Sequence, residues 1–299
     1  MESRPKQIFW KQSMREDHRK IFRTFIRNRT ATIGAGVILF FIVIAILAPL
    51  LAPYDPTAAD AAARLKKPSL KHPLGTDRNG RDMLSRIIYG SRLSLQVGIV
   101  AVGIAIIIGS ILGLFAGYYG GWLDNIVMRL MDIMLAFPSI LLAIVIVAAL
   151  GPNLFNAMIA VSVVSIPAYA RILRASALTI REREYVLAAK ALGASNLRII
   201  STAVLPNCLA PLIVQATLGM GTAILDAAGL SFLGLGALPP KPEWGAMLNE
   251  NFWSMRVAPW TVTTPGVAIL LVVLGFNLLG DGLRDIMDPQ LITKQRNKK

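Results

Sequence analysis

Of the 299 residues, 55% are hydrophobic and only 16% are charged, whereas about 25% are charged in an ordinary soluble domain. Lysine and arginine nevertheless give a formal net charge of +14, and the mean hydropathy is +0.57. This combination excludes a soluble nucleic-acid-binding protein, whose positive charge would lie on a polar surface, and indicates an integral membrane protein whose basic residues report its topology.

Stretches without Asp, Glu, Lys or Arg predict the membrane spans, because an ionised group at mid-bilayer costs roughly 2.5–3.5 kcal/mol. Five such stretches are long enough: residues 30–53, 93–123, 133–170, 199–225 and 257–280. The third exceeds one crossing of about 30 Å and contains the turn signal Gly151-Pro152-Asn153, so it predicts two antiparallel helices. Residues 227–240 are too short to cross and predict an interfacial or re-entrant segment. The sequence therefore predicts an all-α membrane protein with six spans.

Six spans place both termini on one side, and most basic residues fall on that side if the termini are cytoplasmic. A secretory signal peptide is the alternative for the first apolar run, but the run is longer than usual and follows an unusually long basic segment. The first external segment, residues 54–92, does not fit the charge rule. It carries eight basic residues: Arg64, Lys66, Lys67, Lys71, Arg78, Arg81, Arg86 and Arg92.

The end of this external segment predicts an amphipathic helix on the outer membrane surface. Its apolar stripe is Met83, Leu84, Ile87 and Ile88. The opposite side carries Arg81, Asp82, Ser85 and Arg86. In the second span, Gly109, Gly113 and Gly117 recur every four residues, a spacing typical of close helix packing.

The sequence offers little for chemistry. Cys208 is the single cysteine, and His18 and His72 are the only histidines, so we expect no disulfide, no metal site and no catalytic residue. Phosphate-loop, serine hydrolase and zinc protease motifs are absent. The acids close to spans lie near predicted ends, which disfavours an ion-coupled carrier: Asp132, Asp226 and Asp281. Asp226 could line a translocation path or bind a neighbouring residue.

The loop between the fourth and fifth spans carries the strongest signal, from Glu182 to Asn207. One small apolar face is expected at helical spacing: Tyr185, Ala188, Ala189 and Leu192. Gly193 should end this helix, Ser195 should cap a second one, and Pro206 should mark entry to the fifth span. The loop is either an amphipathic linker on the membrane surface or an elbow that a partner protein grips.

This loop resembles the coupling loop of ABC importer permeases, whose pattern is Glu-Ala-Ala, three residues, Gly, nine residues, Ile, any residue, Leu-Pro. Ala188-Ala189, Gly193 and Leu205-Pro206 match at the right spacing. Leu187 stands where the family often has Glu, and Ala203 where it has Ile. The resemblance implies an ATPase-coupling surface formed by Tyr185, Leu187, Ala188, Ala189, Leu192 and Gly193.

Three further segments are similar to the C-type permease subunits of dipeptide and oligopeptide importers. They are residues 72–86, residues 230–245, and residues 280–285 with Asp288-Pro289. The resemblance covers about residues 21–291. It implies a type I ABC importer permease fold with an N-terminal part at 1–92, a permease core at 93–286 containing the coupling loop at 181–206, and a basic tail at 287–299.

The resemblance also implies the partners: a second homologous permease, two cytoplasmic ATP-binding subunits and an extracytoplasmic substrate-binding protein in a bacterial inner membrane. No cofactor is expected in this chain, since ATP would bind to the partner subunits. The external amphipathic helix would then brace the scaffold, which we favour, or dock the binding protein. The unexplained external basic residues would meet the binding protein or lipid headgroups.

Alternative functions stay open. Related importers of glutathione, nickel or another small solute share these segments. A stand-alone channel or carrier is the alternative from another class, and it would transport without ATP or partners.

Overall fold

The computed structural model describes residues 24–287, and the regular secondary structure within them is helical apart from an isolated bridge between Thr76 and Asp82. The expected basic tail and most of the N-terminal segment, including His18, lie outside the described residues. The helices of four or more residues are α2 (Arg29–Ile46), α3 (Ala48–Leu51), α4 (Met83–Tyr119), α5 (Gly121–Ala136), α6 (Ser139–Leu150), α7 (Leu154–Arg181), α8 (Glu184–Ala191), α9 (Asn196–Ile199), α10 (Leu205–Phe232), α11 (Trp244–Asn251) and α12 (Trp260–Met287). Short 3₁₀ turns occupy Ala61–Ala63 and Phe252–Ser254, and a π-helical segment occupies Ile200–Val204.

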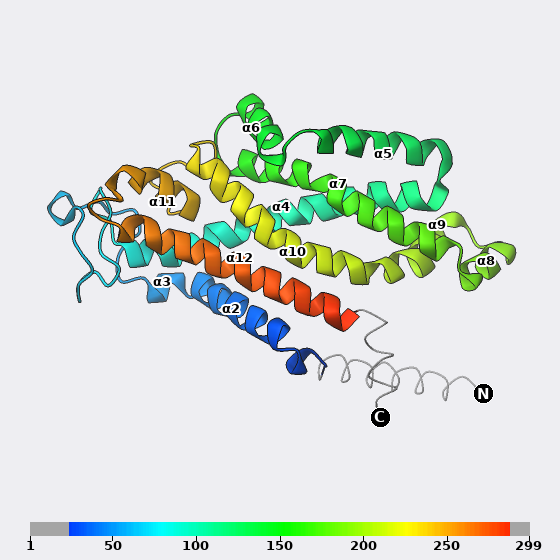
Figure 1. Ribbon diagram of the computed structural model, residues 1–299, viewed down its shortest axis with the longest axis horizontal. Helices are drawn as coiled ribbons and strands as arrows, with labels where there is room; N and C mark the ends of the chain where they lie inside the picture. Colours follow the sequence, from blue (N-terminus) through cyan, green and yellow to red (C-terminus); the bar gives the residue numbers. More distant parts are fainter. Residues whose placement is uncertain (1–23, 288–299) are drawn as a thin grey trace.

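The long helices lie side by side in one bundle (Figure 1). One end of the bundle, called here the α8 end, carries α8 and α9. The opposite end, called the α11 end, carries α11 and the segment between α3 and α4. Five long apolar helices have the length and composition of membrane spans: α2, α4, α7, the continuous stretch Asn196–Phe232, and α12. The prediction of an all-α bundle is confirmed.

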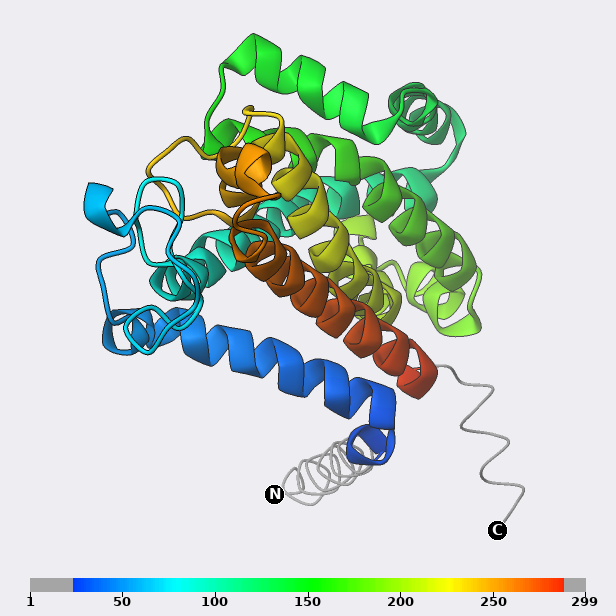
Figure 2. The ribbon, with the colours of Figure 1, turned by 60° about the vertical axis from the view of Figure 1, so that its left-hand side comes forward.

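The third predicted span differs from expectation, because it is broken rather than straight. It consists of α5 and α6, which meet at an angle of 95° across Phe137-Pro138. Proline at 138 forces the residue before it into an extended conformation, which interrupts the helix. Figure 2 shows α5, in darker green, nearly end-on, whereas the neighbouring α6, in lighter green, runs across the view. Counted as one crossing, the pair gives six spans. The predicted turn at Gly151-Pro152-Asn153 is present, with Asn153 capping α7.

Two boundary predictions are wrong. The external amphipathic helix is not a separate surface helix: Asp82 caps a helix that begins at Met83 and continues through the membrane as α4. Its polar residues Ser85 and Arg86 are buried, because they face the segment before α4 and the region of α11. Residues 227–240 do not form one interfacial segment either, since α10 continues to Phe232.

Buried side chains form two adjoining clusters that hold the bundle together. The larger lies mainly between α4, α7 and α10, and its most buried members include Tyr169 and Leu173. The smaller joins α2, α4, α11 and α12 around Trp244 and Val272. Many large apolar side chains outside these clusters are exposed in the isolated chain, as expected for surfaces that lipid or other subunits cover.

The glycines at 109, 113 and 117 all face α7. A Cβ atom on Gly113 would lie 2.1 Å from the carbonyl oxygen of Ala170, and those on the other two would approach the carbonyl oxygens of Ile166 and Arg174. Only hydrogen fits at these positions, so the backbones of α4 and α7 are in direct contact. The two helices therefore behave as one packed unit that leads from one end of the bundle to the other.

Candidate functional site

The loop at the α8 end has the helix–glycine–helix form that its sequence predicts. Gly193 follows α8 with a φ of +80°, a conformation that glycine adopts without a side-chain clash. The amide of Ala194 donates to the carbonyl of Ala189 at 3.1 Å, and the amide of Gly193 donates to that of Lys190 at 3.0 Å, which is the Schellman termination. Ser195 then caps α9, accepting from the amide of Arg198.

The entry to the fifth span differs from a simple proline start. Residues 196–232 form one continuous helix, and Pro206 lies within it, directly after the π-helical segment Ile200–Val204. The amide of Leu205 donates to the carbonyl of Ile200, five residues earlier. This wider turn accommodates the proline, which lacks an amide hydrogen and would crowd a normal α-turn.

The six residues of the expected coupling surface do not all face outward. Tyr185, Leu187, Ala188, Leu192 and Gly193 are exposed, with Leu192 at 88%. Ala189 is half-buried, because it turns toward the bundle together with Val186, whose side chain is 3% exposed. Val186 is the inward anchor of α8, which the helical spacing of the loop did not indicate. Nor did that spacing indicate Leu197, an apolar side chain of α9 that is 68% exposed beside the same surface.

The loop is attached to α4 as well as to its flanking spans. The Tyr118 hydroxyl, at the end of α4, donates to Oδ1 of Asn196 at 3.0 Å. Nη1 of Arg181 donates to the carbonyl of Gly117 at 3.0 Å. A partner that moves α8 would therefore move α4 and α7 together.

Asp226 lies partly buried in the half of α10 nearer the α11 end. It forms no hydrogen bond or ion pair with any other residue of the 24–287 range. Of the two roles considered for Asp226, binding to a neighbouring residue is therefore not seen within the described part of the chain.

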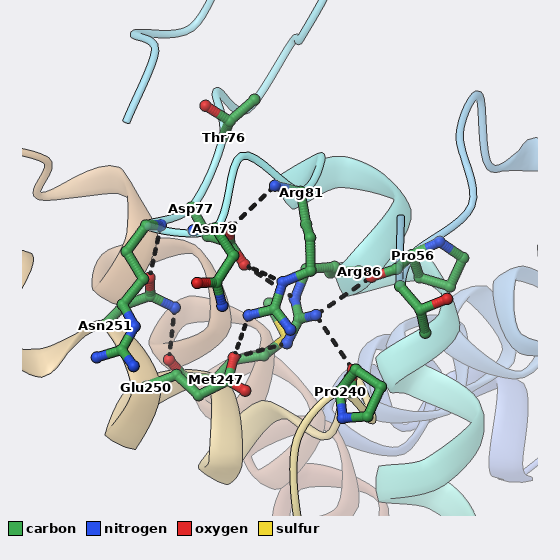
Figure 3. A network of polar contacts seen from close by, with 12 residues as sticks. Pro56, Thr76, Asp77, Asn79, Arg81, Arg86, Pro240, Met247, Glu250 and Asn251 are labelled. Atoms are coloured by element: carbon green, nitrogen blue, oxygen red, sulfur yellow. Dashed lines mark hydrogen bonds and ion pairs between the residues drawn. The ribbon is translucent and has the colours of Figure 1, made fainter. Parts of the chain in front are cut away.

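The α11 end contains a buried group of charges, which we call the outer ion cluster: Asp77, Arg81, Arg86 and Glu250 (Figure 3). Oε2 of Glu250 accepts from Nη2 of Arg81 at 2.5 Å and from Nη2 of Arg86 at 3.0 Å. Nε of Arg81 donates to Oδ2 of Asp77 at 2.6 Å. All four side chains are at most 5% exposed. The cluster joins the segment before α4, the start of α4 and the end of α11.

A contact between His72 and Asp82 stabilises the same segment. Nδ1 of His72 lies 2.9 Å from Oδ1 of Asp82, and both side chains are nearly buried. Oδ2 of Asp82 accepts from the amide and the hydroxyl of Ser85, so the one carboxylate both caps α4 and holds His72. The Tyr54 ring packs on the His72 ring with centroids 4.9 Å apart.

The eight basic residues of segment 54–92 divide into groups according to their contacts. Arg81 and Arg86 belong to the outer ion cluster. Arg92 donates to the carbonyls of Ala45 and Ile46 at the end of α2, where a cation compensates the helix dipole. Nε of Arg64 donates to the carbonyl of Arg78. Lys66, Lys67, Lys71 and Arg78 remain exposed. Arg81 and Arg86 therefore link this segment to α11, and neither is available to lipid headgroups or to another protein.

No group of three or more potential metal ligands occurs in the described part of the chain. The features that remain are a bundle of membrane-spanning helices, an anchored loop with exposed apolar residues at one end, and a charged brace at the other.

Comparison with known proteins fits this architecture. Residues 109–293 match the family of binding-protein-dependent transport system inner membrane components, and residues 19–68 match the N-terminal transmembrane domain of oligopeptide transport permease C. The chain belongs to this family of transport permeases. The permease is therefore a multi-pass membrane subunit of a transport system, and its role is transport.

Among relatives, the dipeptide transport system permease protein DppC of Alkalihalophilus pseudofirmus is 55% identical over 91% of this chain and 90% of its own length. The protein of the same name from Haemophilus influenzae is 52% identical over 89% of this chain and 92% of its own. The glutathione transport system permease protein GsiD of Pectobacterium atrosepticum is 46% identical over 93% of both chains.

A solved structure supports the fold. A chain of the MetNI methionine ABC transporter in an inward-facing conformation aligns with a TM-score of 0.57 and 21% identity, over 69% of the permease and 98% of that chain. This confirms the predicted type I permease fold.

Proposed function

We propose that the permease forms half of the membrane pathway of an ATP-driven importer of dipeptides and short oligopeptides. The observation that carries this proposal is the 55% identity to a dipeptide permease over nine tenths of both chains. A second homologous permease forms the other half of the pathway, and an extracytoplasmic binding protein delivers the peptide. Both termini lie in the cytoplasm.

ATP binds to two separate cytoplasmic subunits, and this chain holds neither nucleotide nor cofactor. The coupling loop, residues 181–206, contacts one ATPase subunit through its exposed apolar residues. ATP binding favours one arrangement of the two permeases only if the ATPase holds the two states with different energies, so the contact must transmit force. The contacts of Tyr118 and Arg181 with the loop support this role, since they fix it to the bundle.

Substitution of Gly193 by Asp tests the coupling role. Any side chain at this position is strained because φ is +80°, and the new carboxylate would lie beside Leu192 on the exposed apolar surface. We expect the variant to insert into the membrane, to lose the ATPase subunits during purification in mild detergent, and to lose peptide uptake.

Gly151→Asp is the matched control, since Gly151 also has a positive φ of +93° and open space around it but lies at the other end of α7. The Gly151→Asp variant should retain both its ATPase subunits and its peptide uptake. Normal uptake by the Gly193→Asp variant would overturn the assignment.

Glutathione is the second candidate substrate, because a glutathione permease is 46% identical over 93% of both chains. Uptake by a deletion strain that carries the complete transporter separates the candidates. We expect unlabelled dialanine, and not glutathione, to compete with radiolabelled dialanine.

A further inference from the structure

Helix α5 presents two different exposed surfaces. Val127 and Met131 face the bundle and are its buried residues. One exposed surface is apolar and consists of Ile126, Leu130 and Ile133. The other is polar and consists of Asn125, Arg129 and Asp132, which share one side of the helix at about 100° per residue. Lipid suits the first surface, and the second needs a different environment.

The polar surface continues onto α7 through an ion pair. Nη2 of Arg171 donates to Oδ1 of Asp132 at 2.6 Å, and the two side chains are 51% and 62% exposed. Arg171 lies ten residues before Arg181, the last residue of α7, which places it about 15 Å inside that helix. Both residues belong to helices with the length and composition of membrane spans, and they directly flank the uncharged stretch 133–170.

Two possible environments, lipid and the second permease, fit this polar surface poorly. Contact with lipid tails is disfavoured, because ionisable side chains on spanning helices face a bundle interior or a water-filled cavity in almost all cases. A contact with the second permease is disfavoured, because the centres of protein interfaces are depleted of charged residues. Arg129 also has no ion-pair partner within residues 24–287, so the surface carries an excess positive charge. An aqueous path is the environment that suits it.

A neighbouring ion pair shows what a structural bridge between these helices looks like. Arg174 contacts Asp124 with two bonds, Nε to Oδ1 at 2.5 Å and Nη2 to Oδ2 at 2.6 Å, and Asp124 is 13% exposed. This pair fixes α5 on α7. The Asp132–Arg171 pair has one bond and is half exposed, and exposed pairs contribute little to stability, so it can exchange partners at little cost.

We propose that Asp132 and Arg171 line the translocation pathway and bind the charged termini of a passing peptide; this inference rests on the proposed peptide-import function. Oδ2 of Asp132 accepts from the peptide ammonium, and the guanidinium groups of Arg171 and Arg129 donate to the peptide carboxylate. The substrate replaces one weak ion pair by two charge-assisted contacts. A zwitterionic peptide of two or three residues supplies both charges.

Thiol labelling tests whether the surface is aqueous. In a Cys208→Ala background, which removes the only cysteine, Ala175→Cys places a thiol one turn from Arg171 on the exposed side of α7. Leu130→Cys is the control on the apolar surface of α5. In membrane vesicles of the complete transporter, a charged thiosulfonate reagent should modify the Ala175→Cys variant rapidly and the Leu130→Cys variant slowly, and dialanine should slow the first reaction. Equal rates, or no reaction at either position, would overturn the proposal.

Removal and reversal of the two charges test the role of the Asp132–Arg171 pair. Asp132→Asn and Arg171→Gln should each lower kcat/KM for dialanine uptake by roughly tenfold or more, a loss of about 1.4 kcal/mol per factor of ten. The double variant Asp132→Arg, Arg171→Asp keeps an ion pair, so it should assemble normally with its partner subunits and still transport poorly.

Wild-type uptake by this reversed pair would identify a purely structural bridge and refute the inference. If the wild-type transporter itself takes up no dialanine, the proposed function fails instead, and the labelling rates still decide whether the surface is aqueous.

Discussion

Removal of Glu250 should strongly destabilise the α11 end. Its carboxylate contacts both arginines of the outer ion cluster, at 2.5 and 3.0 Å, and within residues 24–287 it is the only acid in contact with Nη2 of each. Glu250→Ala would leave Arg81 and Arg86 to share Asp77, with one uncompensated positive charge in a region that is at most 5% exposed. Breaking a buried pair in this way costs about 3–5 kcal/mol.

The assay is thermal unfolding of the detergent-solubilised transporter, followed by tryptophan fluorescence at a fixed scan rate. At roughly 2–4 °C per kcal/mol, the expected decrease in apparent Tm is about 6–20 °C. Lys241→Ala is the control, because Lys241 is exposed near α11 and should change stability by less than about 0.5 kcal/mol.

A second variant separates an unpaired charge from lost packing. Replacing the whole cluster by apolar residues of similar size removes the uncompensated charge, and such replacements are neutral or stabilising in other proteins. This variant should therefore recover most of the lost Tm. An apparent Tm for Glu250→Ala within about 2 °C of wild type would refute the reasoning, since it would mean that water screens the cluster.

Two further predictions concern packing and protonation. Gly113→Val should separate α4 from α7, because its Cβ would lie 2.1 Å from the Ala170 carbonyl oxygen; we expect loss of folded transporter in size-exclusion chromatography, whereas Gly36→Val, with open space around it, should behave as wild type. Glu243 is a buried N-cap of α11, and burial raises its pKa despite its bonds to two backbone amides. Because the folded-state pKa exceeds the unfolded one, this group's contribution to stability should fall as pH rises from its ordinary pKa through the raised value. The Glu243→Gln variant should lack that slope in a series of melts, and identical slopes would contradict it.

The loop at the α8 end could be predicted in detail because its signals are local. Gly193 and Ser195 act on their own backbone or on that of residues within one or two turns. The inward turn of Ala189 could not be predicted in the same way. Helical spacing groups Ala189 with Tyr185 and Ala188, but the packing of Val186 against the bundle decides which side of α8 is buried.

The start of α5 shows a similar limit of sequence-based prediction. A scan for uncharged stretches begins the third span at residue 133, because Asp124, Arg129 and Asp132 interrupt the apolar sequence. In the folded chain two of these charges bind arginines of α7, so α5 begins at Gly121 despite them. Hydropathy treats each charge as if it stood alone, and it therefore misplaces a helix whose charges are compensated by another helix.

The burial of two basic residues in segment 54–92 could not be predicted from the sequence for the same reason. Charge counting alone assigns Arg81 and Arg86 to the surface, where they would contact lipid or a partner protein. Their acid, Glu250, lies 169 and 164 residues further along the chain, and no local pattern connects the three. Once α11 folds back over the start of α4, two apparent topology violations become the interior of a neutral cluster. Lys66, Lys67, Lys71 and Arg78 remain exposed, with no ion pair inside residues 24–287, so their charges are still free to meet another molecule.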